Sequence, residues 1–354
     1  MFNASRSQYR RSTGLFITTI FMLLGSLYLS MACNTDQESS PAPESLAESN
    51  TEVAVEEKTN KQIAIPVFAS TSIVGDWVRN VGGDRIIVEH LAPAGKDPHT
   101  YQPTPKEVAK LSESELVFSI GLTLEGKNIS SLLENSLNPV ATHIFLGPLV
   151  NPIEYKKHDE HDEHDEHDEH DEHDEHDEHD HGALDPHFWL DPTRVSIAVD
   201  EITAQLSRID PASAAFYQEN ASVYKGQLSS LDKQIASAFE QIPEKDRKLV
   251  TSHEALGYLG DRYGFEIIGA VIPSISTESG PTAAAIAKLV DELKAEEVKG
   301  IFMETGVEEK VTTQISQDAN VEVITGLQVE YVLEGESYLQ MMTKLSELIS
   351  EGLK

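Results

Sequence analysis

The sequence predicts an α/β protein of two lobes, each with a parallel sheet flanked by helices, joined by one long rigid helix. Short apolar runs alternate with helical runs in the first half, and the same alternation returns in the second half, as is typical of parallel sheets in α/β layers. Between the halves, a helical stretch continues without proline for some 30 residues. The chain is also long enough for two ordinary domains.

In the first half, we expect strands at 62–70, 84–93, 115–121 and 142–147, and helices at 72–82 and 104–114. The helix at 104–114 has the clearest beginning. Thr104 is a capping residue, Pro105 takes the first helical position, and Glu107 completes a capping box.

In the second half, we expect strands at 248–252, 265–272, 301–305 and 321–325, and helices at 254–264, 282–300, 308–320 and 337–354. Two further helices, at 191–209 and 211–242, lie between the halves. The second of these would be about 45 Å long at a rise of 1.5 Å per residue. It is long enough to span both lobes as a rigid strut.

These segments divide the chain into a signal peptide, a polar tether, a first lobe that carries an inserted loop, linking helices and a second lobe. The respective ranges are 1–33, 34–61, 62–190 with the loop at 156–182, 191–243 and 244–354.

The N-terminus predicts export from the cytoplasm. Three arginines precede an apolar run at Leu15–Leu29, and the small-residue stretch "SMAC" ends at Cys33. The stretch resembles a bacterial lipoprotein signal, which would make Cys33 the lipidated first residue of the mature chain. Cleavage after Ala32 without lipidation, or retention as a membrane anchor, are alternatives. All three place the body of the protein outside the cytoplasm.

Within the inserted loop, the tract from His158 to His181 consists of histidine and acidic residues alone. Its histidines are His158, His161, His164, His167, His170, His173, His176, His179 and His181. A period of three matches neither a helix nor a strand, and no apolar residue is available for burial, so the loop is expected to be disordered. Exposed imidazoles bind metals, and an unstructured tract should bind them weakly at several places. The alternative is a low-complexity repeat without a role.

Charge and cysteine content narrow the function classes. The net charge of −33 disfavours the binding of nucleic acid and favours the binding of cations. The single cysteine excludes an intrachain disulfide and a thiolate metal site.

Three histidines outside the tract share a context. His99 and His187 each end an Asp-Pro-His tripeptide, and His253 follows the strand at 248–252. Ligands of open parallel sheets bind at the carboxyl ends of strands. The aspartate of each tripeptide could orient its histidine as an outer carboxylate. His90 and His143 lie inside strand-like runs and are interpreted as packing residues.

The motifs "DPHTYQPTP", "DPHFWLDP", "SHEALGYL" and "IFMET", together with the long central helix, resemble the solute-binding proteins of bacterial zinc and manganese ABC transporters. The resemblance extends from Gln62 to Lys354. The zinc-uptake branch also carries a His- and acid-rich loop at the position of the tract. The resemblance implies a metal site in the cleft between the lobes and no enzymatic activity.

The resemblance implies His99, His187 and His253 as metal ligands. Manganese-binding relatives have a carboxylate at the third place. Three candidates remain for the fourth ligand: Glu330, Glu304 and a water molecule. Three imidazoles and one oxygen suit tetrahedral Zn²⁺, whereas Mn²⁺ prefers more carboxylates; copper and nickel also accept imidazole.

Two other function classes use the same residues. A zinc hydrolase could use Glu254 as a general base, although Gly257 stands where an HExxH motif needs its second histidine. In a surface adhesin or structural lipoprotein, the metal would only stabilise the fold. We expect instead a monomeric, extracytoplasmic and lipid-anchored receptor that captures Zn²⁺ and delivers it to an ABC-transporter permease.

Overall fold

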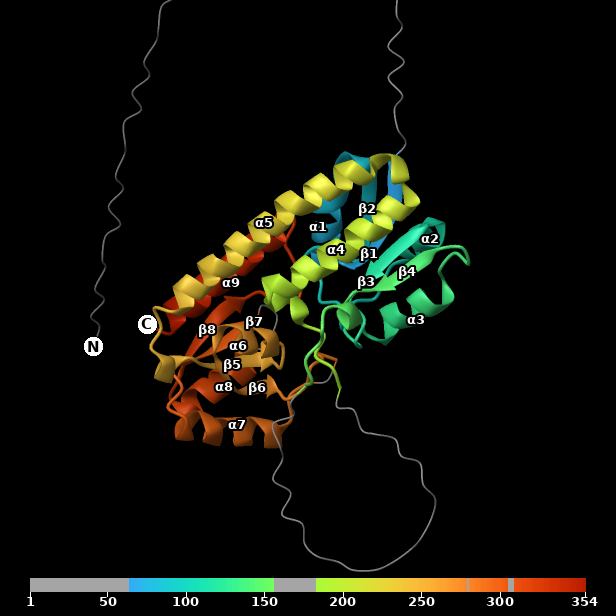
Figure 1. The fold of residues 1–354 in the computed structure, drawn as a ribbon. Helices are drawn as coiled ribbons and strands as arrows, with labels where there is room; N and C mark the ends of the chain where they lie inside the picture. Colours follow the sequence, from blue (N-terminus) through green and yellow to red (C-terminus); the bar gives the residue numbers. More distant parts are fainter. Residues whose placement is uncertain (1–63, 156–182, 279, 305–308) are drawn as a thin grey trace, which may run out of the picture. The chain divides into compact units, whose positions relative to one another are not determined.

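The computed structural model describes residues 64–155, 183–278, 280–304 and 309–354. Residues Asn60–Lys354 form one compact unit. It contains two four-stranded parallel sheets with helices packed on them, which confirms the predicted fold class (Figure 1). Within the described ranges, no helix has both the length and the apolar character needed to cross a membrane.

The first sheet has the strand order β2-β1-β3-β4. Its strands are β1 (Ile65–Thr71), β2 (Ile86–Ala92), β3 (Leu116–Ser119) and β4 (Thr142–Phe145). Its helices are α1 (Ser72–Gly82), α2 (Pro105–Glu113) and α3 (Lys127–Asn135). The capping box at Thr104 and Glu107 forms as expected. Helix α3 was not expected from the sequence.

The second sheet repeats this order as β6-β5-β7-β8. Its strands are β5 (Lys248–His253), β6 (Glu266–Ile272), β7 (Gly300–Glu304) and β8 (Glu322–Leu327). Its helices are α6 (Gly257–Tyr263), α7 (Ala283–Ala295) and α8 (Glu309–Ala319). Helices α6 and α7 are shorter than the sequence predicted.

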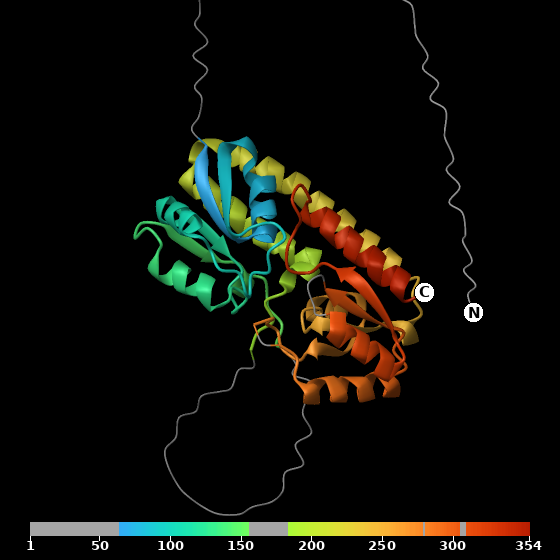
Figure 2. The ribbon, with the colours of Figure 1, turned by 180° about the vertical axis from the view of Figure 1, so that it is seen from behind.

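Three long helices connect the halves. They are α4 (Pro192–Ile209), α5 (Ala214–Phe239) and α9 (Tyr338–Gly352). Helix α5 has 26 residues, fewer than the expected stretch, because a 3₁₀ turn occupies Pro211–Ser213 and because the helix ends at Phe239. Figures 1 and 2 both show α9 running beside α5. Asn220 at one end of α5 donates to the Val81 carbonyl of the first half, and Asp232 nearer its other end accepts from Arg262 of the second.

The two halves share one apolar core. Trp77 of α1 contacts Tyr338 of α9 edge-on, with ring centroids 5.7 Å apart. The Tyr338 hydroxyl donates to the Trp189 carbonyl, and the Trp189 indole donates to the Val329 carbonyl at 3.0 Å. These bonds fix the segment containing His187 against the segment containing Glu330, although some 140 residues separate them in sequence.

Candidate metal centre

Four side chains from four separate segments meet in the interior. They are His99, which lies between β2 and α2; His187, just before a 3₁₀ turn; His253, the last residue of β5; and Glu330, in the loop after β8. One potential ligand atom from each lies within 4.8 Å of all the others. None of the four side chains is more than 2% exposed.

A carboxylate fixes the ring of His187. Its Nδ1–H donates to Asp185 Oδ1 at 2.8 Å, and its backbone N–H donates to the same oxygen at 2.9 Å. The opposite nitrogen, Nε2, therefore faces the cluster, 3.3 Å from a Glu330 oxygen. Asp185 thus plays the part that the sequence suggested for the aspartate of an Asp-Pro-His tripeptide.

His253 is oriented in the same way by Glu304. Its Nδ1–H donates to Glu304 Oε1 at 2.6 Å. Its Nε2 lies 3.2 Å from Glu330 Oε1 and 3.4 Å from the Nε2 of His187. Glu304 therefore lies behind a histidine ring, whereas Glu330, the other carboxylate proposed for the fourth position, lies within the cluster.

His99 differs from the other two histidines. The expectation that Asp97 orients its ring was wrong, because Asp97 Oδ1 accepts instead from the backbone N–H of His99, at 2.8 Å. Within the part of the chain that the structure describes, neither ring nitrogen of His99 has a hydrogen-bond partner. The nearest charged atom is Glu330 Oε2, 3.7 Å from Nε2. The ring is thus held in place by its backbone and by packing alone.

Burial and mutual charge shift the pKa values of the cluster in different directions. Burial lowers the pKa of His99 to about 4, with Glu330 opposing the shift. Burial also disfavours charge on His187, but Glu330 and Asp185 outweigh it and raise the pKa to about 9. For His253, Glu304 and Glu330 outweigh burial and raise the pKa well above its usual value.

Burial would by itself raise the pKa of Glu330, but the imidazoles, His187 foremost, hold it well below its usual range. Both Glu330 oxygens and both His99 nitrogens are nevertheless buried, and none of them has a hydrogen-bond partner among the described residues. Buried polar atoms almost always have partners. A cation bound between three imidazoles and one carboxylate would provide a partner for one ring nitrogen of His99 and for at least one oxygen of Glu330, so the residues present suit a metal ion.

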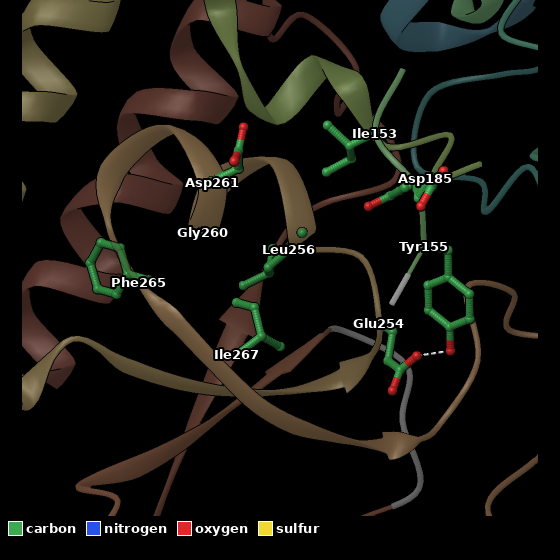
Figure 3. Close-up of a pocket in the computed structure, with 11 residues that line it drawn as sticks. Ile153, Tyr155, Asp185, Glu254, Leu256, Gly260, Asp261, Phe265 and Ile267 are labelled. Carbon is green, nitrogen blue, oxygen red and sulfur yellow. Dashed lines mark hydrogen bonds between the residues drawn. The ribbon is translucent and has the colours of Figure 1, made fainter. Parts of the chain in front are cut away.

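The other residues singled out in the sequence lie elsewhere. Glu254 lines a pocket of about 630 Å³ and accepts a hydrogen bond from the Tyr155 hydroxyl (Figure 3). Its carboxylate is not part of the cluster. His90 contacts Arg79, and His143 contacts Ser119. Cys33 and the histidines of the tract are outside the described residues.

Comparison with known proteins identifies the class. The family described as ZnuA, the periplasmic component A of the zinc-uptake complex, matches residues 67–352. The manganese ABC transporter substrate-binding lipoprotein PsaA of Streptococcus mitis is 32% identical over 82% of this chain and 89% of its own length. The metal ABC transporter substrate-binding lipoprotein FimA of Streptococcus parasanguinis is 30% identical over the same shares.

Solved structures show the same fold. The periplasmic zinc-binding protein TroA of Treponema pallidum has a TM-score of 0.70 at 21% identity and covers 82% of this chain and 99% of its own. A manganese-bound periplasmic metal-binding protein of Candidatus Liberibacter asiaticus has a TM-score of 0.69 at 23% identity, covering 82% and 100%.

The fold and the relatives define a substrate-binding receptor of a metal ABC transporter, which is not an enzyme. Within that class, the chain belongs to the family of the periplasmic component A of the zinc-uptake complex.

The pKa shifts predict a steep pH dependence of metal binding. The pKa values of His187 and His253 are raised, which favours protons on both rings in the metal-free protein, and a metal ion must displace any proton held on a ligating nitrogen. The zinc affinity of the cluster should therefore fall as the pH is lowered through these raised pKa values, by up to about a hundredfold per pH unit where both rings are protonated. Chelator-competition titrations measure this slope, and an affinity independent of pH would contradict the charged histidines.

Proposed function

We propose that the protein is an extracytoplasmic zinc receptor, which captures Zn²⁺ with His99, His187, His253 and Glu330 and delivers it to a membrane permease. The buried cluster of three imidazoles and one carboxylate carries this proposal. Tetrahedral zinc takes this number and type of ligands. The outer carboxylates of Asp185 and Glu304 orient two of the rings, as is usual for zinc-binding histidines.

The donor set favours zinc over manganese. Mn²⁺ prefers oxygen ligands, and Glu330 is the one carboxylate that the described residues contribute to the cluster. The two nearby carboxylates, Asp185 and Glu304, already accept hydrogen bonds from ring nitrogens. Recruiting either as a ligand would remove the group that orients a histidine.

Manganese is the second candidate cargo. Several relatives of 31–33% identity are named manganese ABC transporter lipoproteins. Because zinc binds most nitrogen and oxygen sites more tightly than manganese, a higher zinc affinity alone would not decide between the cargoes. The deciding observation is which metal the transporter moves.

We also propose that the receptor is held at the membrane by a lipid on Cys33. The relatives named lipoproteins support Cys33 as a lipid anchor that keeps a monomeric receptor beside its permease.

The histidines from His158 to His181 serve as an accessory zinc buffer. If the tract is disordered, as its sequence predicts, it must order itself around each ion, and this entropy cost would make its binding weaker than that of four ligands held in place beforehand.

Replacing His99, His187 or His253 with Ala should remove the tightest zinc site, because each ring supplies one bond to the metal. Titration calorimetry on the metal-free protein measures the loss. His143→Ala is the matched control, since this histidine contacts Ser119 outside the cluster, and it should bind zinc as the wild type does. Unchanged tight binding after any one of the three substitutions would show that this residue is not a ligand.

Uptake by cells identifies the cargo. A strain that lacks the receptor should grow poorly when zinc is limiting, and its uptake of radioactive zinc should fall at least about tenfold while manganese uptake changes little. Expression of the wild type should restore zinc uptake, and the His187→Ala variant should not. Loss of manganese uptake with zinc uptake intact would assign the receptor to manganese.

Deletion of 158–181 should leave one tight site and lower the total zinc stoichiometry to about one, because the tract supplies only weaker sites. Calorimetry and metal analysis of the deletion variant beside the wild type provide the measurement. Loss of tight binding would make the tract the main site, and an unchanged stoichiometry would deny it any role in binding.

A further inference from the structure

The segment Ser274–Glu278, which we call the bridge, is hydrogen-bonded to the chain near two of the proposed ligands, His253 and His99. It lies between β6 and α7 in the second half of the chain. One end of the bridge is bonded beside His253, and the other end is bonded to the loop that carries His99. These two histidines come from different sheets, so the bridge connects the two halves at the metal centre itself.

At the first end, the backbone N–H of Glu254, the residue after His253, donates to the Ser274 carbonyl at 3.0 Å. Hydroxyl groups then brace the bridge internally. The Ser276 N–H donates to Ser274 Oγ at 3.1 Å, and the Glu278 N–H donates to Ser276 Oγ at 3.2 Å. Successive bonds of this kind give a short loop a defined path.

At the second end, the Thr277 hydroxyl donates to Asp97 Oδ2 at 2.6 Å. The other oxygen of the same carboxylate accepts the backbone N–H of His99 at 2.8 Å. Asp97 therefore joins His99 to the opposite half through one side chain. Hydrogen bonds to a charged acceptor are stronger than neutral ones.

A second contact joins the bridge to the N-terminus of α3, which packs against the backbone of His99. Glu278 accepts from the backbone N–H of Lys127 at 3.4 Å, at the N-terminus of α3, where negative charge is favoured. The preceding residue, Gly126, packs so closely that a Cβ there would lie 1.8 Å from the His99 carbonyl oxygen. The bridge thus touches both the loop of His99 and the helix end packed against it.

Only His99 among the three histidines depends on this arrangement. The rings of His187 and His253 are fixed by their own outer carboxylates. The ring of His99 has no such partner. Its position follows from its backbone, and that backbone is tied to the second half through Asp97 and Thr277.

We propose that Asp97 and Thr277 are positioning residues that hold His99 in the metal site, so that the bond between them sets the rate of metal release. When the bond breaks, the loop of His99 is free to withdraw from the cluster, and the metal keeps the ligands that are anchored independently. This inference rests on the proposed function, since it assumes that His99 is a ligand of transported zinc.

The test is Thr277→Val in the full-length mature chain, which removes the hydroxyl and keeps the shape of the side chain. Wild type and variant are loaded with half an equivalent of zinc, and release into excess fluorescent chelator is followed by stopped flow. We expect release to become about tenfold faster, equivalent to about 1.4 kcal/mol. The association rate should stay within about twofold of wild type, because capture does not require the closed bridge.

Two matched variants separate positioning from general damage. Thr277→Ser keeps the hydroxyl and should release zinc at close to the wild-type rate. Thr100→Val removes the other hydroxyl bonded to Asp97, at 3.2 Å, which comes from the same loop as His99 and does not cross between the halves. It should change release by less than about twofold.

The outcomes are distinguishable. Wild-type release from Thr277→Val, or equal acceleration in Thr277→Ser or Thr100→Val, would overturn the bridge while leaving the zinc receptor intact. A wild-type protein without a tight zinc site would overturn the proposed function, and the bridge with it. Fast release by Thr277→Val alone supports both.

Discussion

The structure depends on a carboxylate buried among three imidazoles. An isolated ion in the interior costs several kcal/mol, and partners of opposite charge must offset that cost. Glu330 meets this condition because the rings of His187 and His253 face it, and its charge raises the pKa of both rings and so favours their protonated forms when no metal is bound. A metal ion replaces the protons with its own charge, so the same geometry serves both states. The cluster can therefore form before metal arrives, and under the proposed function the metal would find its ligands in place.

The preformed cluster requires that segments distant in sequence keep a fixed spacing. The shared core provides it: Trp77, Trp189 and Tyr338 pack together, and Trp189 is bonded to the chain next to Glu330. Helix α5 contacts both halves with polar side chains. Substantial separation of the halves would open this core and expose large aromatic surface, which is unfavourable in water. Local movement of the loops that carry the cluster residues requires much less free energy than separation of the halves. The contacts that hold each loop can therefore affect function.

Local signals in the sequence predicted most of the fold. The features that were not predicted depend on contacts between residues that are distant in the sequence. The capping box at Thr104 marked α2 because both partners lie within four residues. Helix α3 has no side-chain cap of its own, and the carboxylate at its N-terminus belongs to Glu278, 151 residues away. The three histidines were identified from their motifs, but the partner of Asp97 was not. Thr277 lies in a loop without a distinguishing pattern, and only folding brings it to the carboxylate.

The unequal support of the ligands bears on how a receptor can bind tightly and still deliver its cargo. Ligands all held rigidly would favour affinity and slow release, since every metal bond would have to break within a fixed frame. Here two rings are fixed by carboxylates in their own halves, and the third is held through a hydroxyl from the opposite half. A permease that displaces the bridge would need to break a few exposed or part-buried polar contacts, with the Thr277–Asp97 bond among them, and would leave the aromatic core intact. Under the proposed function, tight capture would come from the fixed rings and Glu330, and release would be governed by His99.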